Sequence, residues 1–173
     1  MKPNIQEHNA IISFEDYKNK VIQDYKLVVL SRQCSILGRR EVLNGKGKFG
    51  IFGDGKELPQ VVLNHFFQKG DYRAGYYRDQ TLLMAQGLLD TDKFFAALYG
   101  HPDLKYEPMS GGRQMGAHFM TSNIDPNGNW ISQKDIFNHS ADLSPTASQM
   151  PRLVGLAQAS KVYRDLNIKD SCN

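Results

Sequence analysis

Apolar residues recur at helical spacing through the first part of the chain. They are Phe14, Tyr17, Val21, Tyr25, Val28 and Val29. Ser13 stands where an N-terminal cap is favoured, and Glu15 and Asp16 complement the positive end of a helix that begins there. We therefore predict a helix from Ser13 to about Val42.

A glycine-rich segment follows this helix. Residues 44–55 hold five glycines in twelve positions, which is too many for the interior of a regular element, so we predict a loop. A new apolar stripe, at the spacing of one helix face, predicts a short second helix that ends at Gly70. The stripe consists of Leu58, Val61, Val62, His65 and Phe66.

The middle of the chain alternates short elements with an irregular segment. Residues 71–79 bring three tyrosines and two arginines together, and we predict a brief strand and a turn there. A helical pattern returns over 81–89, and Thr91 is expected to cap a further helix. Residues 101–142 are rich in Gly, Pro, Asn and Ser, and so long an irregular segment indicates a functional role or ordering by a partner.

The last predicted element opens at Ser144, as a cap, with Pro145 in the first helical position, and it continues to about Tyr163. Small residues four apart form a ridge that lets another backbone approach closely; they are Ala147, Pro151, Gly155 and Ala159. The apolar residues Met150, Leu153, Val154 and Leu156 are expected to be core. These elements together predict an α/β protein that is mostly helical with few short strands.

Charge and cysteine content narrow the class of protein. The formal net charge is +3, from 21 basic and 18 acidic residues, and this balance argues against a nucleic-acid partner. Basic residues dominate 27–50, which is typical either of a solvated surface or of a segment near an acidic partner or a phosphorylated ligand. Cys34 and Cys172 form no disulfide framework, and no apolar run approaches the roughly 20 residues of a membrane span. We expect a cytoplasmic protein with no membrane partner.

Three glycine motifs partly match known nucleotide-binding or metal-binding signatures. Residues 45–50 spell G-x-G-x-x-G, but a helix precedes them where the dinucleotide fold needs a strand. Residues 50–56 spell G-x-x-x-x-G-K, but Glu57 follows where magnesium needs a Ser or Thr hydroxyl. Residues 53–55 spell G-D-G without the asparagine that completes the magnesium motif of thiamine-diphosphate enzymes. We therefore interpret the segment as a loop leading into a helix.

The five histidines show no metal-binding spacing. His118 and His139 nevertheless lie in or near the long glycine-rich segment, so we consider both as candidate catalytic groups, with a surface or structural role as the alternative.

Four stretches, read in order, resemble the α chain of the E1 component of 2-oxo acid dehydrogenases. The stretches are 45–48 (Gly-Lys-Gly-Lys), 77–79 (Tyr-Arg-Asp), 111–115 (Gly-Gly-Arg-Gln-Met) with His118, and 144–151 (Ser-Pro-Thr-Ala-Ser-Gln-Met-Pro). The resemblance runs from about residue 20 to residue 163, and the Gly-Arg-Gln-Met stretch resembles the branched-chain, 2-oxoisovalerate type. It implies the thiamine-diphosphate-binding fold, with 1–173 as the N-terminal part of that domain and 1–12 as a flexible tail.

The resemblance also implies roles for individual residues. Tyr77 and Arg78 match the family's pair that binds the cofactor's diphosphate, a role that suits a planar guanidinium because it donates paired hydrogen bonds and stays charged. The alternative is that Arg78 pairs with Asp79 at the surface. Ser144 and Thr146 match the residues placed beside the thiamine.

In several family members the segment that matches 144–149 wraps a potassium ion. The resemblance implies that Pro145 offers its carbonyl oxygen and that Ser148 and Gln149 offer side-chain oxygens. Two departures weaken the match: Leu143 stands where a serine ligand is frequent, and Gln80 replaces a histidine of the pyruvate type.

The implied reaction is the oxidative decarboxylation of a 2-oxo acid with transfer of the acyl group to a lipoyl domain of E2. The family pattern puts the Mg²⁺ ligands outside this chain and the activating carboxylate on a β half or β subunit, within a homodimer or an α2β2 assembly. The chain would then form one wall of the site and would be inactive alone. A pyruvate-type or acetoin-type E1 remains an alternative, as does a non-catalytic module that binds an anionic ligand or partner.

Overall fold

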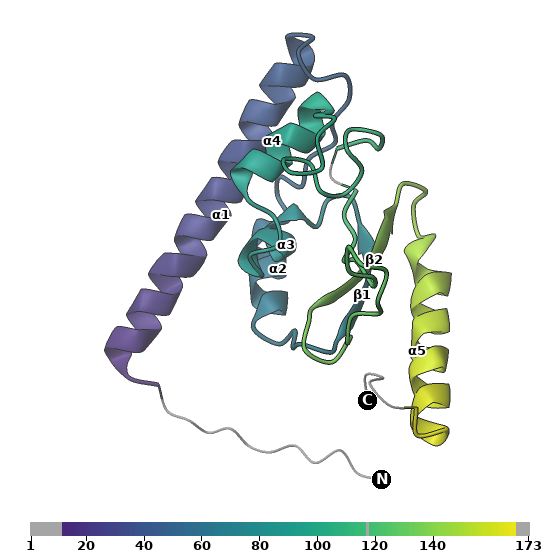
Figure 1. Cartoon of the computed structure of the whole chain (residues 1–173). Coiled ribbons are helices and arrows are strands. Elements are labelled where there is room, and N and C mark those ends of the chain that lie inside the picture. The colour runs from purple at the N-terminus through teal and green to yellow at the C-terminus, as the bar shows by residue number, and fades with distance from the viewer. Residues whose placement is uncertain (1–11, 117, 169–173) are drawn as a thin grey trace.

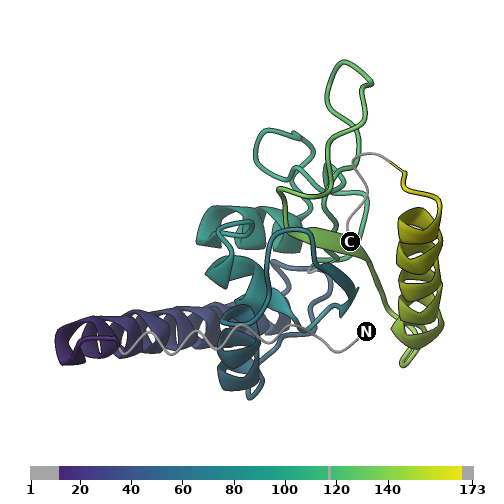
Figure 2. The ribbon, with the colours of Figure 1, turned by 90° about the horizontal axis from the view of Figure 1, so that it is seen from below.

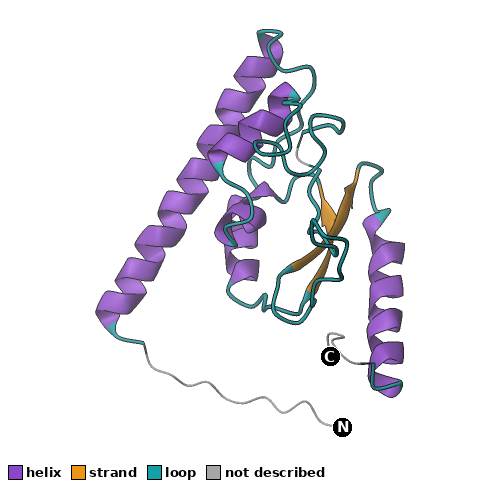
Figure 3. Ribbon diagram, viewed as in Figure 1, coloured by secondary structure: helices purple, strands orange, loops and turns teal. Residues whose placement is uncertain are grey.

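A computed structural model describes residues 12–116 and 118–168. Its elements in chain order are α1 (Phe14–Leu43), α2 (Glu57–Asn64), β1 (Tyr72–Tyr76), α3 (Gln80–Ala85), α4 (Thr91–Tyr99), β2 (Asn138–Leu143) and α5 (Gln149–Asp165). Helices dominate, and the two named strands form one parallel sheet (Figure 3). The prediction of a mostly helical chain with few short strands is confirmed; all of the expected tail except Ile12 lies outside the described residues.

Helix α1 begins and ends within about a residue of its predicted bounds. The Ser13 hydroxyl accepts a hydrogen bond from the backbone N–H of Asp16 at 3.0 Å, as expected of a cap. The predicted apolar stripe, however, does not form core: Phe14 is 79% exposed and Tyr25 is 68% exposed. The reason is visible in Figure 1, where the N-terminal half of α1 extends beyond the other elements.

The buried face of α1 is formed by small and polar residues of its C-terminal half. The Ser31 hydroxyl lies 2.7 Å from that of Thr81, and the Gln80 amide donates to the Ser31 carbonyl and the Ser35 hydroxyl. The Gln80 carbonyl accepts from the backbone N–H of Gly53 at 3.3 Å. Gln80 therefore ties α1 and α3 to the glycine-rich loop, a task for which an amide that both donates and accepts is suited.

Next to this polar contact lies the apolar core, which joins α1, the loop, α3 and α4. It consists of Cys34, Phe52, Met84, Phe94 and Leu98. The predicted loop over 44–55 is confirmed as irregular. At Gly53 a side chain would collide with the carbonyl oxygen of Arg78, so this glycine lets the loop pack directly on the turn after β1.

Four predicted boundaries are wrong. The helix predicted over 81–89 ends at Ala85. Helix α2 ends at Asn64 and not at Gly70, because the chain after His65 turns toward β1. Thr91 is the first residue of α4 and not its cap; the Asp90 carboxylate accepts from the backbone N–H of Lys93 at 2.8 Å. Ser144 does not cap α5, which begins at Gln149, and Ser148 at its N-terminus makes no capping hydrogen bond.

Helix α5 also contradicts the prediction about its packing. None of its residues is buried, and Met150 and Val154 are 64% and 71% exposed. Figure 2 shows α5 standing beside the sheet and away from α1. Its contacts within the described residues are to β1, and the Arg152 guanidinium donates to the Ala141 carbonyl of β2.

Strand β2 lies inside the segment that was predicted to be irregular. Tyr72 pairs with Asn138, Arg73 with His139 and Tyr76 with Leu143, with an irregularity between Ala74 and Tyr76. Two parallel strands that are more than 60 residues apart are thereby joined, and their carboxyl ends lie side by side.

A buried ion pair links the two strands. The Arg73 guanidinium, 7% exposed, donates to Asp142 of β2 at 2.7 Å and to Asp79 of the following turn at 3.1 Å. Gly75 leaves the room for this contact, because a side chain there would overlap the Arg73 guanidinium and the Asp142 carboxylate.

We predict that Gly75→Ala destabilises the protein by about 2 to 3 kcal/mol, because the buried ion pair must move to accept the methyl group. Gly155→Ala is the matched control: no atom lies within 4 Å of its added carbon, and alanine in a helix interior should give between no change and about 1 kcal/mol of stabilisation. Urea unfolding followed by circular dichroism measures both. Equal midpoints for Gly75→Ala and the wild type would contradict the prediction.

Candidate functional site

The carboxyl ends of β1 and β2 carry the candidate site. Tyr76 pairs with Leu143 at the end of the sheet, so Tyr77 and Ser144 leave it next to each other. Ligands of open parallel sheets bind at this edge. A cavity here is lined by Tyr77, His118 and Ser144 and closed by residues of the glycine-rich loop and of the 111–116 segment. The structure thus brings together three of the residues that the sequence analysis selected.

His118 contacts three other residues that line this cavity. Its Nε2 lies 2.6 Å from the Ser144 hydroxyl, its Nδ1 lies 3.1 Å from the Met115 carbonyl, and its ring stacks on Tyr77 at 6.1 Å. A carbonyl oxygen only accepts, so the proton of a neutral ring sits on Nδ1 and Nε2 accepts from Ser144. Nε2 is therefore the nitrogen that faces a hydroxyl and can accept a proton.

Arg78 has no carboxylate within ion-pair distance among residues 12–116 and 118–168. Its guanidinium lies over the rings of Tyr77 and Tyr76, at 5.4 Å and 5.9 Å from their centroids. The alternative that Arg78 pairs with Asp79 is wrong, because Asp79 instead accepts from the Arg73 guanidinium and from the backbone N–H of Tyr76. A guanidinium in this state is available to an anionic ligand.

Tyr76 is a member of the site that the sequence analysis missed. Its hydroxyl lies 2.6 Å from that of Tyr77, and the two rings are 4.0 Å apart. The hydrogen bond with Tyr77, a side-chain interaction with Thr146 and the charge of Arg78 lower the pKa of Tyr76 below its ordinary value. Thr146 is thereby placed at the same site, and the two adjacent tyrosines at a strand end were the available signal.

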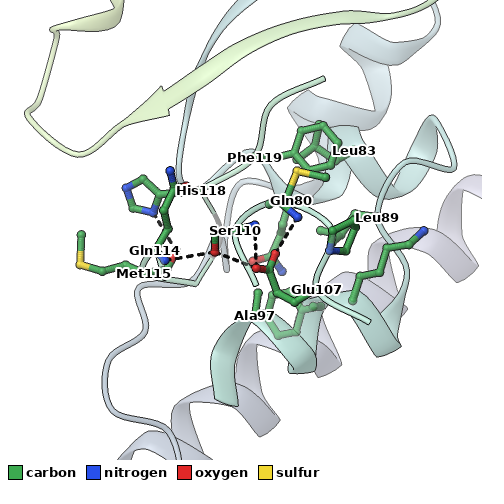
Figure 4. A pocket seen from close by; sticks show the side chains of 14 residues that line it. Gln80, Leu83, Leu89, Ala97, Glu107, Ser110, Gln114, Met115, His118 and Phe119 are labelled. Atoms are coloured by element: carbon green, nitrogen blue, oxygen red, sulfur yellow. Dashed lines mark hydrogen bonds between the residues drawn. The ribbon is translucent and has the colours of Figure 1, made fainter. Parts of the chain in front are cut away.

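A buried carboxylate, Glu107, shapes the segment that carries His118. Glu107 is 2% exposed and accepts hydrogen bonds from the backbone N–H groups of Met109, Ser110 and Gly112 and from the Ser110 hydroxyl. Burial alone would raise the pKa of Glu107, but these hydrogen bonds outweigh it and hold the pKa below the ordinary value. Figure 4 shows Glu107 and Ser110 joined on one side of a pocket that His118 also lines.

His139 lies apart from these residues. It is 2% exposed, its Nδ1 accepts from Arg73 at 3.1 Å, its Nε2 lies 2.6 Å from the Gln86 carbonyl, and its ring stacks on Phe67. Burial and then the charge of Arg73 lower its pKa to about 3. Since both nitrogens are engaged and the ring stays neutral, this geometry matches the structural alternative and not the catalytic one.

The predicted metal-binding residues lie at the N-terminus of α5 and in the short loop before it. The Pro145 carbonyl accepts from the Ser148 hydroxyl at 2.7 Å, and Ala147 adopts a left-handed conformation with φ 68°. The Gln149 side-chain oxygen is buried and has no hydrogen-bond partner. A carbonyl, a hydroxyl and an unpartnered amide oxygen are a donor set that fits a hard cation such as K⁺.

Within the described part of the chain, no three or more side chains of His, Cys, Asp or Glu gather as a metal cluster. Over the same residues, no helix combines the length and the apolar composition that crossing a bilayer requires.

One known protein resembles this chain over most of the chain's residues. No protein-family profile matches the chain. The chain is 30% identical over 148 residues to the 2-oxoisovalerate dehydrogenase subunit alpha of Bacillus subtilis (strain 168), an alignment that covers 84% of this chain and 39% of that protein. The chain therefore spans well under half of the length of this relative, and the similarity supports a relationship to these α subunits over that part.

The neutral state of His139 predicts how stability depends on pH. As the pH falls from about 6.5 toward 3, the imidazole of His139 binds a proton in the unfolded protein but stays neutral in the folded protein. This difference lowers the free energy of unfolding as the pH falls. Asp142 opposes this: burial, only partly offset by Arg73, raises its pKa to about 6, so the folded carboxyl takes up a proton first and adds stability on acidification.

We expect His139→Gln to remove the first effect and leave the second. The free energy of unfolding of the variant, relative to the wild type, should therefore be higher at about pH 4.5 than at about pH 7. Urea titrations at both pH values measure this difference. If the free energies of unfolding of the variant and the wild type differ by the same amount at both pH values, His139 is protonated in the folded state at the lower pH.

Proposed function

We propose that this chain forms the diphosphate-binding wall of a thiamine-diphosphate-dependent 2-oxo acid dehydrogenase E1, as the N-terminal part of its α domain. The observation that carries the proposal is the Arg78 guanidinium without a carboxylate partner, next to the Tyr77 hydroxyl at the carboxyl edge of a parallel sheet. The similarity to a 2-oxoisovalerate dehydrogenase α subunit supports the enzyme over a non-catalytic anion-binding module, and the branched-chain type over a pyruvate or acetoin type.

In this proposal each residue has a separate task. Arg78 and Tyr77 bind the diphosphate with one charged and one neutral donor. Ser144 and Thr146, held by His118 and Tyr76, line the position of the thiamine. When bound, thiamine diphosphate supplies the nucleophilic carbanion and the electron sink for loss of CO₂. His118, with its Nδ1–H donated to the Met115 carbonyl, has Nε2 as the nitrogen that can take a proton from a reacting oxygen and return it.

The proposal extends to the rest of an E1. A β half or β subunit would supply the second wall, the Mg²⁺ ligands would lie on residues outside this chain, and a lipoyl domain of E2 would accept the acyl group of the 2-oxo acid. Such an assembly would be a homodimer or an α2β2 tetramer.

The binding role of Arg78 can be tested by calorimetric titration of thiamine diphosphate, with Mg²⁺, into the complete E1 assembly. Arg78→Ala should weaken binding by about 1.5 to 3 kcal/mol, because one charge-assisted contact is lost. Arg40→Ala, on the exposed surface of α1, is the matched control and should bind as the wild type does. An unchanged affinity in Arg78→Ala would overturn the proposed function.

A potassium ion is proposed between Pro145, Ser148 and Gln149. We expect KCl, compared with NaCl at the same ionic strength, to raise the melting temperature by about 2 to 4 °C, the effect of about 1 kcal/mol of binding. Gln149→Ala should abolish the difference, because it removes the buried oxygen that lacks a partner. Gln158→Ala, an exposed glutamine of the same helix, should keep it. Identical melting in both salts for the wild type would exclude the ion.

A further inference from the structure

A second hollow opens beside the cavity of Tyr77 and His118. It lies between the 50–52 stretch of the glycine-rich loop and Arg78, and its other charged residues are Arg39, Asp54 and Lys56. Ile51 lines both the hollow and the cavity, so the two are neighbours along one wall.

The charges around this hollow do not balance. Arg39 donates to Asp54 at 2.5 Å, and this contact lowers the pKa of the Asp54 carboxyl. Neither Lys56 nor Arg78 has a carboxylate within ion-pair distance among the described residues. Of the three cations that line the hollow, only Arg39 has an anionic partner, which is Asp54. The positive charges of Lys56 and Arg78 therefore remain uncompensated.

Hydrogen bonds and close packing fix the backbone around Lys56. Its N–H donates to the Gly53 carbonyl at 2.9 Å, and Gly53 packs directly on the carbonyl of Arg78. The next residue, Glu57, is 3% exposed, bonded to Arg32 at 2.6 Å and 2.8 Å, and it accepts from the Gly55 N–H. The loop thus fixes the origin of the lysine side chain relative to Arg78.

We infer that Lys56 is a second cation for the anion that Arg78 binds, and that the hollow selects a diphosphate over a single phosphate. A diphosphate is long enough to engage two separate cations at once, whereas one phosphate group satisfies only one of them well. This inference rests on the proposed function and adds to it a binding residue on the glycine-rich loop. Lys56 is also the lysine of the G-x-x-x-x-G-K stretch, and the inference gives it a role although this stretch is not a nucleotide-binding loop.

The test uses inorganic pyrophosphate and inorganic phosphate as probes, titrated calorimetrically into the full chain without divalent cations, so that only protein charges act. The wild type should bind pyrophosphate at least about tenfold more tightly than phosphate. Lys56→Gln should weaken pyrophosphate binding about tenfold and leave phosphate binding nearly unchanged, which collapses the selectivity.

Two variants serve as controls. Lys48→Gln, an exposed lysine of the same loop that does not line the hollow, should bind both probes as the wild type does. Lys56→Arg keeps the charge and should keep the selectivity, which separates an effect of charge from one of loop folding.

The outcomes distinguish this inference from the proposed function. If Lys56→Gln keeps the affinity for pyrophosphate while Arg78→Ala loses it, Lys56 is not part of the site and the inference falls, but the proposed function stands. If both variants bind pyrophosphate as the wild type does, both proposals fall. Equal affinity of the wild type for the two probes also overturns the inference.

Discussion

The buried contact of Arg73 with Asp142 and Asp79 is the interaction on which the rest of the site depends. A guanidinium that is 7% exposed has lost most of its water, and only charged partners with good geometry offset that cost. Two of its partners, Asp142 and His139, lie on β2, and the third, Asp79, lies in the turn after β1. The contact therefore fixes the register of the parallel pair, and this register places Tyr77 beside Ser144.

The same network reaches the third segment of the site. The second oxygen of Asp142 accepts from the backbone N–H of Phe119 at 3.1 Å, which holds the residue next to His118 against β2. On the other side, Glu107 binds three backbone N–H groups of the segment that leads to His118. Two buried carboxylates thus position one partly exposed imidazole. Chain segments without regular structure can be ordered in this way when their backbone donors all find acceptors.

Features that depend on neighbouring residues could be predicted from the sequence, whereas features that depend on distant contacts could not. The start of α1 depends on Ser13 and three neighbouring residues, so a local pattern suffices. Strand β2 could not be predicted, because Asn138, His139 and Asp142 are poor strand formers. The buried groups of His139 and Asp142 bond to Arg73 and Gln86, which lie more than 50 positions away. The joining of Tyr77, His118 and Ser144 was accessible only through the family resemblance, and Tyr76 and Glu107 act through contacts that no periodicity reveals.

The two arginines of the Arg73–Arg78 stretch show how surroundings assign different roles to the same side chain. Arg73 faces the sheet interior, where an unpaired charge would be costly, and two carboxylates hold it. Because Asp79 is committed to Arg73, it cannot neutralise its direct neighbour Arg78. Arg78 is only partly exposed and rests on two tyrosine rings, which stabilise a cation without consuming its hydrogen-bond donors. Arg73 thereby leaves Arg78 without a carboxylate partner, which is the condition for the anionic ligand that we propose for it.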